Sequence, residues 1–381
     1  MTQTIVPGST IGILGAGQLG RMLALVARRM GYGVAVFGGD RTSPCGQVAD
    51  AVWPGNYADE QQLTEFANAC DVVTYEFENI PAAAAGTIAG ITPLHPNANL
   101  LAVAQNRLKE KTALRDCGLP TAQFRMVHSA DELETARADF GGDVILKANT
   151  DGYDGKGQWS ISADTDLTQL WTSSGLEEGL VEQRVRFDFE LSVVAGRYAD
   201  GTCAFFDPFL NHHANHILDV TVSGSDLVTP TLAAQATEMA RGVLERFDVV
   251  GVLCIELFLT TDGQLVVNEI APRPHNSGHL TIEAYNCSQF ELQLRTICHL
   301  PSVPLQKHAP AAAMANLLGQ HLPEIWTTST TQSLTETHLH LYGKGGARPG
   351  RKMGHLTTLD DLAGGAEQRV RSVRDSLLAA E

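Results

Sequence analysis

The sequence lacks the cysteine spacings that mark disulfide frameworks or cysteine-bound metals. Its seven cysteines stand at positions 45, 70, 117, 203, 254, 287 and 298, and no two of them form a C-x-x-C pair. Isolated cysteines of this kind are typical of a reducing compartment, where the thiols stay reduced. We therefore expect reduced, mostly buried cysteines.

Positive charge is also scarce. The chain carries 43 Asp and Glu residues against 27 Lys and Arg residues, which gives a formal net charge of −16 at pH 7. Nucleic acids and anionic membranes bind proteins through an excess of basic residues. This balance argues against both as partners, and any phosphate that the protein binds must be met by a local group of cations.

Long hydrophobic runs are absent. No uninterrupted apolar run approaches the roughly 18 residues of a membrane-spanning helix, and the N-terminus has no basic region followed by an apolar core. We expect a soluble, cytoplasmic protein.

The 381 residues exceed one typical domain, so we expect two or three domains around a sizeable core. From residue 10 to about 105, short apolar runs such as "TIGILG" and "GVAVFG" alternate with helical patterns, which indicates βαβ units and a parallel sheet. After about residue 118, strands follow one another, which favours a mostly antiparallel α+β unit. A third segment follows Pro301 and Pro304. The predicted boundaries are 1–105, 106–305 and 306–381.

The stretch "ILGAGQLGRM" matches a dinucleotide-binding fingerprint. Glycines stand at positions 15, 17 and 20, and Asp40 follows about 20 residues later, where such proteins bind a ribose hydroxyl. A nicotinamide-dependent dehydrogenase is therefore one reading. The physical prediction is narrower, because these glycines only allow backbone N–H groups at a helix start to approach an anion.

A second glycine-rich stretch, "LKANTDGYDGKGQW", covers residues 146–159. Lys147 stands at the end of a predicted strand, and the glycines that follow frame Asp154 and Lys156. Such a loop can lay backbone donors over a triphosphate. It is not a P-loop, because G-x-x-x-x-G-K-[ST] is absent. The alternative is an ordinary mobile surface loop.

Two acidic residues stand inside apolar runs further along the chain. Glu256 and Glu269 fall on two strands joined by the turn "TTDGQ", where an unpaired carboxylate would be costly. Magnesium is usually bound through one or two carboxylates, with phosphate and water completing its shell. We expect a magnesium site here, and the alternative is an ion pair of one carboxylate with Arg273 or Lys147.

These motifs resemble the ATP-grasp superfamily. Within it, "TYEFENI", "DGYDGKGQ" and "NEIAPRPHNSGHLT" are similar to the N5-carboxyaminoimidazole ribonucleotide synthase family, the carboxylating enzymes of bacterial and fungal purine biosynthesis. The resemblance covers essentially the whole chain. It implies a mixed α/β and α+β fold: a Rossmann-like pre-ATP-grasp domain, an ATP-grasp domain with a lid over about 120–185, and a small C-terminal domain that completes the substrate site.

The resemblance implies an ATP site with a phosphate lid over residues 152–158 and a hinge that binds adenine. Its residues would be Arg107, Lys147, Gly152, Tyr153, Asp154, Gly155, Lys156, Gly157, Gln158, Glu182, Gln183, Arg184, Val185, Glu190, His213, Asn268 and Glu269. Glu256 and Glu269 would hold the magnesium. The chain departs from the family's N-x-H-x-x-G-I-L pattern at His216, where glycine is usual. The histidine-rich "NHHANH" could instead indicate a transition-metal site.

The resemblance also gives the first glycine loop another ligand than NAD, namely the 5′-phosphate of aminoimidazole ribonucleotide. Asp40 would then have no ribose role. Glu78 competes with Glu76 for the place that faces the substrate. The implied substrate residues are Gln18, Leu19, Glu76, Tyr153, Lys156, Arg273, His275, Asn276, Lys344 and Arg351.

For catalysis we expect Asp154 as general base, Arg273 as oxyanion stabiliser and Lys156 reaching over from the lid. The expected cofactors are ATP and one or two magnesium ions, without NAD or biotin, and the family implies a homodimer. Formate-dependent glycinamide ribonucleotide formyltransferase is the alternative within the superfamily, because it has a similar "NE-x-x-PRPH" ending. A biotin carboxylase, the dehydrogenase and a nucleotide-binding regulator without turnover are weaker readings.

Overall fold

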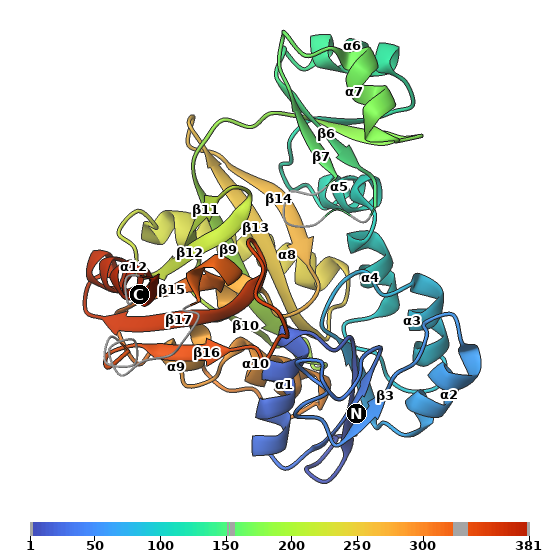
Figure 1. The fold of residues 1–381 in the computed structure, drawn as a ribbon, viewed down its shortest axis with the longest axis vertical. Coiled ribbons are helices and arrows are strands. Elements are labelled where there is room, and N and C mark those ends of the chain that lie inside the picture. The colour runs from blue at the N-terminus through green and yellow to red at the C-terminus, as the bar shows by residue number, and fades with distance from the viewer. Residues whose placement is uncertain (1–2, 151, 153–156, 323–333, 379–381) are drawn as a thin grey trace.

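The computed structural model describes residues 3–150, 152, 157–322 and 334–378. Their strands form three sheets, which occupy different parts of the molecule (Figure 1). Within these ranges no helix is both long enough and apolar enough to cross a membrane.

The N-terminal sheet is parallel, as the alternating pattern predicts, with the strand order β3-β2-β1-β4. Its elements are β1 (Thr10–Leu14), α1 (Gln18–Arg29), β2 (Gly33–Phe37), β3 (Ala51–Trp53), α2 (Glu60–Asn68), β4 (Val72–Tyr75) and α3 (Ala82–Ala89). Apolar strand residues such as Ile13, Val36 and Val73 are fully buried. Helices on both faces make this burial possible, which is the usual arrangement of a parallel sheet.

A second, antiparallel sheet has the order β5-β8-β6-β7. It is built from β5 (Phe124–Val127), α6 (Ala130–Asp139), β6 (Val144–Ala148), β7 (Gln158–Ile161), α7 (Leu167–Ser174) and β8 (Gly179–Gln183). It has its own small core around Leu133, Val144 and Leu146, and stands apart from the other sheets at one end of the molecule (Figure 1). This sheet lies within the range expected to form the lid.

The central sheet has nine strands, all paired antiparallel. They are β9 (Phe187–Arg197), β10 (Cys203–Phe205), β11 (Phe209–Ala214), β12 (Ile217–Ser223), β13 (Gly251–Thr260), β14 (Leu265–Ala271), β15 (Ala311–Leu318), β16 (His338–Leu341) and β17 (Lys352–Asp360). Strand β15 pairs with β12. The last strands of the chain therefore extend the sheet begun by β9.

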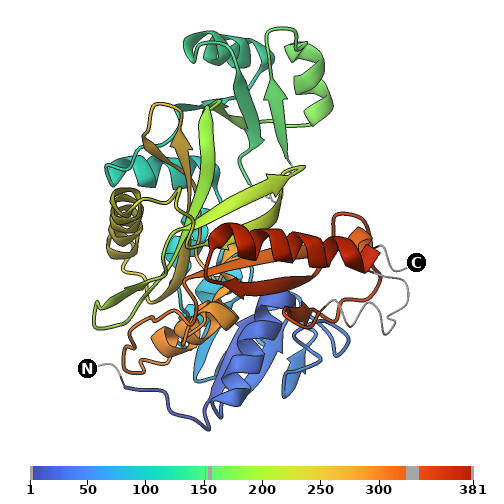
Figure 2. The ribbon, with the colours of Figure 1, turned by 90° about the vertical axis from the view of Figure 1, so that its left-hand side faces the viewer.

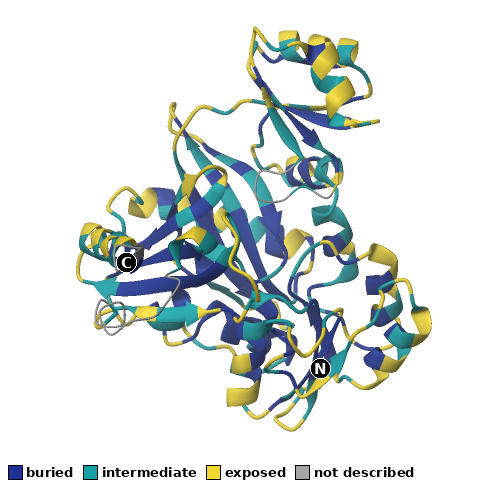
Figure 3. Ribbon diagram, in the orientation of Figure 1, coloured by how far each residue is buried: buried dark blue, intermediate teal, exposed yellow. Residues whose placement is uncertain are grey.

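The remaining helices cover the faces of these sheets. They are α4 (Ala98–Ala104), α5 (Arg107–Asp116), α8 (Pro230–Arg246), α9 (Thr281–Ala284), α10 (Gln289–Ile297) and α12 (Ala363–Leu378), with the 3₁₀ turns η1 (Asn276–Gly278) and η2 (Gly319–His321). Figure 2 shows α12 lying across the C-terminal strands. The buried residues gather along the central sheet, whereas the outer faces of the helices are exposed (Figure 3).

Side-chain caps explain where several helices begin. Thr229 accepts a hydrogen bond from Leu232 N, with Pro230 in the first turn of α8, and Asn106 accepts one from Lys109 N at the start of α5. Such caps stabilise a helix start by about 1 kcal/mol. The cap at Asn106 fixes the first residue of α5, Arg107, which is one of the predicted site residues.

Candidate active site

A cavity of about 1270 Å³ opens between the three sheets. Its walls include Gln18 from α1, Lys147 from β6, Glu182 from β8 and Glu256 from β13. The site is therefore built from segments that lie far apart in the sequence.

Most of the predicted site residues line this cavity. They are Gln18, Leu19, Glu76, Arg107, Lys147, Gly152, Gln158, Glu182, Gln183, Arg184, Val185, Glu190, His213, Glu256, Asn268, Glu269, Arg273, His275, Asn276, Lys344 and Arg351. Gly157, with a φ of +68°, is not among its lining residues. Tyr153, Asp154, Gly155 and Lys156 lie outside the described residues.

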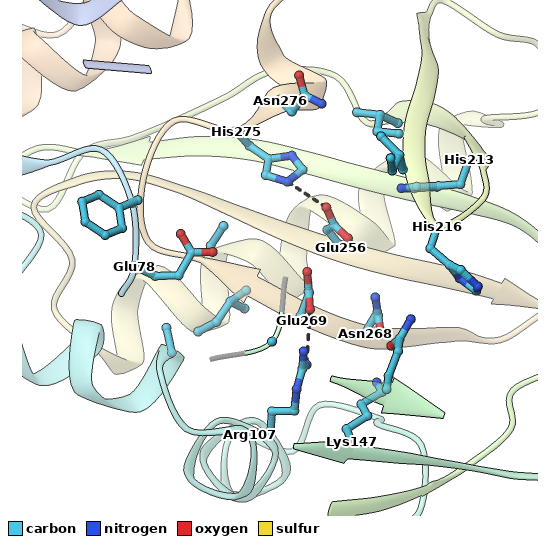
Figure 4. Close-up of a pocket in the computed structure, with 18 of the residues that line it drawn as sticks. Glu78, Arg107, Lys147, His213, His216, Glu256, Asn268, Glu269, His275 and Asn276 are labelled. Carbon is cyan, nitrogen blue, oxygen red and sulfur yellow. Dashed lines mark ion pairs between the residues drawn. The ribbon is translucent and has the colours of Figure 1, made fainter. Parts of the chain in front are cut away.

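The two predicted metal carboxylates stand directly opposite each other. Glu256 on β13 is the cross-strand partner of Glu269 on β14, and the ladder bulges immediately after Glu256. Directly opposed Cβ atoms in an antiparallel pair lie about 5 Å apart. Figure 4 shows both carboxylates facing the cavity together with Asn268 and Lys147.

Each carboxylate has a cationic or protonatable neighbour. Glu256 Oε1 lies 2.8 Å from His275 Nε2, and Glu269 Oε2 lies 3.5 Å from Arg107 Nη1. The alternative that one carboxylate pairs with Arg273 or Lys147 is therefore not what the structure shows.

The contact between Glu256 and His275 changes the pKa of both side chains. Burial raises the pKa of Glu256, but the neighbouring His275 outweighs burial and lowers it to about 2. Burial lowers the pKa of His275, whereas Cys254 and Glu256 raise it to about 10. Glu256 therefore remains a carboxylate over the whole physiological range.

A buried cluster of three charges lies where the second sheet borders the cavity. Glu182 Oε2 is 2.9 Å from Lys147 Nζ and 3.4 Å from Lys111 Nζ. Burial raises the pKa of Glu182, but Lys147 and Lys111 lower it to about 2. Lys111 also donates a hydrogen bond of 2.5 Å to the backbone oxygen of Asn268. The cluster thus ties the predicted hinge residue to the strand that carries Glu269.

Sequence reasoning missed Lys111. The stretch "NRLKEKTALRDCG" carries several charges and is typical of a solvated helix face, yet the Lys111 side chain is only 1 % exposed. A usable signal was present, because Lys111 follows Arg107 by four residues and so lies on the same face of α5.

Glu110, 2 % exposed, was missed as well. It accepts a 2.7 Å hydrogen bond from Ile270 N and lines the cavity.

The first glycine loop is occupied by a side chain of the protein itself. Glu76 accepts hydrogen bonds from Gly17 N and, at 2.9 Å, from Gly20 N at the start of α1. A Cβ at position 17 would lie 2.5 Å from Glu76 Oε1, so the Glu76 carboxylate could not keep this position beside a larger residue. The loop here thus holds the Glu76 side chain, while Gln18 and Leu19, between the two glycines, line the cavity.

Asp40 has a local role. Its Oδ1 accepts hydrogen bonds from Thr42 N, Thr42 Oγ1 and Ser43 N, which closes a turn on the surface. The carboxylate that completes the dinucleotide fingerprint is thus engaged in its own loop.

Glu78, the competitor of Glu76, binds Arg273. The guanidinium donates from Nε to Oε2 at 2.5 Å and from Nη2 to Oε1 at 2.7 Å. Burial lowers the pKa of Arg273, but Glu78 raises it above its ordinary value. Glu78 comes from the loop after β4 and Arg273 from the loop after β14, so this pair joins those two loops at the cavity wall.

The hairpin between β11 and β12 carries His213 and the departure at His216. His213 Nδ1 lies 2.9 Å from Glu190 Oε2. The two turn residues, Asn215 and His216, have φ values of +51° and +64°. Positive φ at both positions of a two-residue turn fits a type I′ hairpin, in which glycine is favoured. The loop therefore keeps the left-handed backbone although histidine stands there.

The remaining histidines do not support a transition-metal site. His212 Nε2 lies 3.5 Å from Glu367 Oε1 on α12. Within the part of the chain that the structure describes, no group of three or more His, Cys, Asp or Glu side chains could hold a metal ion.

Cations from the C-terminal segment complete the cavity. Lys344 donates a 2.8 Å hydrogen bond to the backbone oxygen of Lys352, and Arg351 donates one of 2.9 Å to Gly346 O. Arg348 and Lys352 line the cavity as well, although neither was predicted. The signal was the stretch "KGGARPGRKMGH", which holds all four cations.

The last histidines of the motifs "HNSGH" and "GRKMGH", His279 and His355, contact each other in the interior. The rings of His279 and His355 lie 4.7 Å apart and both side chains are fully buried. Burial lowers the pKa of each ring well below its usual value, so both are neutral. This contact holds the strand that follows the C-terminal cations against the turn that carries Asn276.

The donor set fits magnesium bound through a nucleotide. Glu256, Glu269 and the amide of Asn268 offer hard oxygen atoms on adjacent strands. Two carboxylates are too few for an all-protein cage, and magnesium usually completes its shell with phosphate oxygens and water. The neighbouring Lys147 and Arg107 would meet the same phosphates.

Three family models match consecutive parts of the chain. The Ribonucleotide synthetase preATP-grasp domain matches residues 8–105, the ATP-grasp domain matches residues 112–290, and the Phosphoribosylaminoimidazole carboxylase C-terminal domain matches residues 312–369. The ATP-grasp fold with a pre-ATP-grasp domain, expected from the sequence, is confirmed.

Relatives that are similar over nearly the whole chain identify the enzyme family to which it belongs. The N5-carboxyaminoimidazole ribonucleotide synthase of Bacillus subtilis is 39% identical over 93% of this chain and 92% of its own length. That of Pseudomonas aeruginosa is 39% identical over 91% of this chain and 93% of its own. The chain belongs to the N5-carboxyaminoimidazole ribonucleotide synthase family. It also matches a bifunctional purine synthesis protein of Dictyostelium discoideum at 39% identity, and spans 37% of that protein's length.

Solved structures of N5-carboxyaminoimidazole ribonucleotide synthases share the fold. A crystal structure of an ADP complex superposes with a TM-score of 0.91 at 38% identity and covers 98% of both chains. The enzyme of Aspergillus clavatus with ADP and 5-aminoimidazole ribonucleotide has a TM-score of 0.88 at 28% identity, covering 97% of this chain and 98% of its own. The family members are ATP-grasp ligases, so the dehydrogenase reading of the first glycine loop is wrong.

Proposed function

We propose that the protein carboxylates 5-aminoimidazole ribonucleotide with bicarbonate at the expense of ATP, and releases N5-carboxyaminoimidazole ribonucleotide, ADP and phosphate for purine biosynthesis. The observation that carries this proposal is the cross-strand pair of Glu256 and Glu269. It faces the same cavity as the nucleotide-side lysines and the cations of the C-terminal segment.

The nucleotide would lie between the second sheet and the central sheet. Backbone groups of residues 182–185 would bind adenine, and Glu190, held by His213 at 2.9 Å, would bind the ribose hydroxyls. Lys147 and Arg107 would meet the phosphates, with residues 152–158 covering them. The buried Lys111 would keep the hinge and the β14 strand in register.

Glu256, Glu269 and Asn268 would hold magnesium with the phosphates of ATP. The ion would supply charge neutralisation on the transferred phosphoryl group. The number of ions, one or two, remains a prediction.

Bicarbonate is a poor electrophile, so it needs activation. A bicarbonate oxygen would attack the γ-phosphorus in line, the bond to the bridging oxygen of ADP would break, and carboxyphosphate would form. The exocyclic amine of the ribonucleotide would then attack the carboxyl carbon, or carbon dioxide released from it, with loss of phosphate. Arg273 would stabilise the oxyanion, and Asp154 would accept the amine proton with Lys156 nearby.

The ribonucleotide would bind between the first glycine loop and the C-terminal cations. Gln18, Leu19 and Glu76 would contact it from the N-terminal domain. The remaining contacts would come from Tyr153, His275, Asn276, Lys344 and Arg351. Because water destroys carboxyphosphate, the site must close before the reaction, and the predicted lid over about 120–185 would provide that closure.

The named relatives favour this activity over the formyltransferase alternative. The domain boundaries at 105 and 305, the homodimer and the cytoplasmic location remain predictions.

The decisive experiment measures phosphate release with ATP and magnesium under three conditions: bicarbonate with aminoimidazole ribonucleotide, formate with glycinamide ribonucleotide, and NAD. We expect release with the first pair only. Glu269→Gln should abolish it, whereas Glu245→Gln, at an exposed position of α8, should leave it unchanged. Turnover with formate, or normal release by Glu269→Gln, would refute the proposal.

A further inference from the structure

His275 is held in place at its backbone as well as at its ring. The side-chain amide of Gln289 accepts a hydrogen bond from His275 N and donates one to His275 O, each 2.7 Å long. Gln289 is fully buried at the start of α10. This two-point contact fixes the main chain of His275, so the direction of its ring depends on what the ring nitrogens meet.

One ring nitrogen meets Glu256 and the other meets a serine. Nε2 lies 2.8 Å from Glu256 Oε1, as the dashed line in Figure 4 marks. Nδ1 lies 2.8 Å from Ser277 Oγ and accepts a 3.3 Å hydrogen bond from Ser277 N. The orientation of the imidazole, and with it the Glu256 contact, therefore rests on Ser277.

Ser277 is the first member of a hydrogen-bonded row that crosses three strands. Its Oγ accepts a 2.8 Å hydrogen bond from Ser192 Oγ on β9. Ser192 Oγ accepts one of 2.9 Å from Asn211 Nδ2 on β11, and Asn211 Oδ1 accepts one of 3.0 Å from Thr221 Oγ1 on β12. We name these four residues, Ser277, Ser192, Asn211 and Thr221, the buried relay.

The buried relay lies in the interior of the central sheet. Ser277, Ser192 and Thr221 are 0 % exposed and Asn211 is 6 % exposed. Polar groups at such positions are costly unless hydrogen-bonded, and apolar side chains of similar shape would fill the same space. Each member instead bonds to the next, in one unbranched row that ends at His275.

We propose that the buried relay positions the Glu256 carboxylate for a divalent cation. It fixes the His275 ring, and the ring fixes one carboxylate oxygen so that the other faces the cavity. The members are positioning residues, since they act through His275. The inference rests on the proposed function, because it takes Glu256 as a ligand of the cation. Loss of such outer partners typically weakens metal binding by about 10- to 100-fold.

The test measures binding of Mn²⁺ to the full-length protein with ADP, by electron paramagnetic resonance of the unbound ion. Ser277→Ala, which removes the direct support of His275, should weaken Mn²⁺ binding about tenfold. Thr221→Val keeps the shape of the side chain but shortens the row by one member, and should weaken Mn²⁺ binding by less than Ser277→Ala does. Thr221→Ser keeps the hydroxyl and should bind as the unchanged protein.

The matched control is Thr357→Val. Thr357 is a fully buried threonine on β17 of the same sheet, and its hydroxyl has no hydrogen-bond partner among the described residues. It should leave Mn²⁺ affinity unchanged. Thermal unfolding of each variant shows that the binding measurements are made on folded protein, well below its midpoint.

Glu256→Gln distinguishes a failure of the positioning role from a failure of the metal assignment. If it loses Mn²⁺ binding while Ser277→Ala and Thr221→Val bind normally, the buried relay has no positioning role and the inference is wrong. If Glu256→Gln itself binds Mn²⁺ normally, the metal assignment in the proposed function is wrong, and the inference is overturned with it. Equal losses in Thr221→Val and Thr357→Val would mean that any buried hydroxyl has this effect, which also contradicts the inference.

Discussion

Arg273, in the loop after β14, and Glu78, in the loop after β4, form a two-point ion pair. Both carboxylate oxygens are used, at 2.5 and 2.7 Å, so the plane of the guanidinium is fixed. The proposed oxyanion stabiliser is thus aimed by a residue of the domain that would bind the ribonucleotide.

Glu78→Gln should lower the carboxylation rate at least tenfold, because the amide cannot accept both hydrogen bonds and Arg273 loses its orientation. ADP affinity should stay within twofold of the unchanged protein. Since the Glu78 side chain is 30 % exposed, the loss of stability should be about 1–2 kcal/mol rather than the value for a fully buried pair. Glu65→Gln, at an exposed position on α2, is the control. Normal carboxylation by Glu78→Gln would contradict the role given to Arg273.

Lys111→Met should raise the KM for ATP about tenfold, because Glu182 would lose one of its two cations and Asn268 O its donor. Unfolding in urea should show a loss of about 3 kcal/mol for breaking this buried contact. Lys109→Met is the matched control, since Lys109 is exposed on the same helix. Equal KM values for the two variants would show that Lys111 does not organise the nucleotide site.

Glu110 should make the protein less stable as the pH rises. Burial, followed by the charge of Glu269, raises its pKa to about 7 from its ordinary value of 4.5. The folded state therefore holds a proton that the unfolded state releases, and stability falls between about pH 4.5 and 7. Urea unfolding of the wild type and Glu110→Gln should show their difference shifting by about 2–3 kcal/mol in favour of the variant from pH 5 to pH 8. A pH-independent difference would contradict the raised pKa.

His216→Gly should stabilise the protein by about 0.5–1 kcal/mol. Glycine removes the strain of a left-handed backbone, about 1–2 kcal/mol, and loses part of that gain through its larger entropy in the unfolded chain. Asn215→Gly is the comparison, because asparagine tolerates positive φ and the gain should be smaller. A clear destabilisation by His216→Gly would mean that the imidazole, which lines the cavity, makes contacts that outweigh the strain.

Local sequence patterns predicted much of the architecture. The alternation of apolar runs and helices predicted the parallel sheet, and the turn "TTDGQ" placed Glu256 and Glu269 on paired strands. Strands β11 and β12 were not predicted, because His212 and His213 interrupt the apolar pattern of the first. Their pairing with β9 and β15 depends on contacts that are distant in the sequence.

Partners of charged groups were harder to predict than the groups themselves. The sequence marked Lys147 and Arg273 as functional, but not that Glu182 and Glu78 hold them. Glu76 was expected to face the substrate, and its bonds to Gly17 and Gly20 depend on the pairing of β4 with β1, the strand that precedes α1. Such pairings are decided by tertiary packing, which no local spacing encodes.

The pairing of β15 with β12 ties the final segment of the chain to the central sheet. Because the final segment shares a hydrogen-bonded ladder with the strands that precede it, it cannot detach as a separate body without baring the edge of β12. An uncovered edge of this kind invites association with other chains. Loss of the last segment would therefore endanger solubility as well as the cationic wall of the cavity.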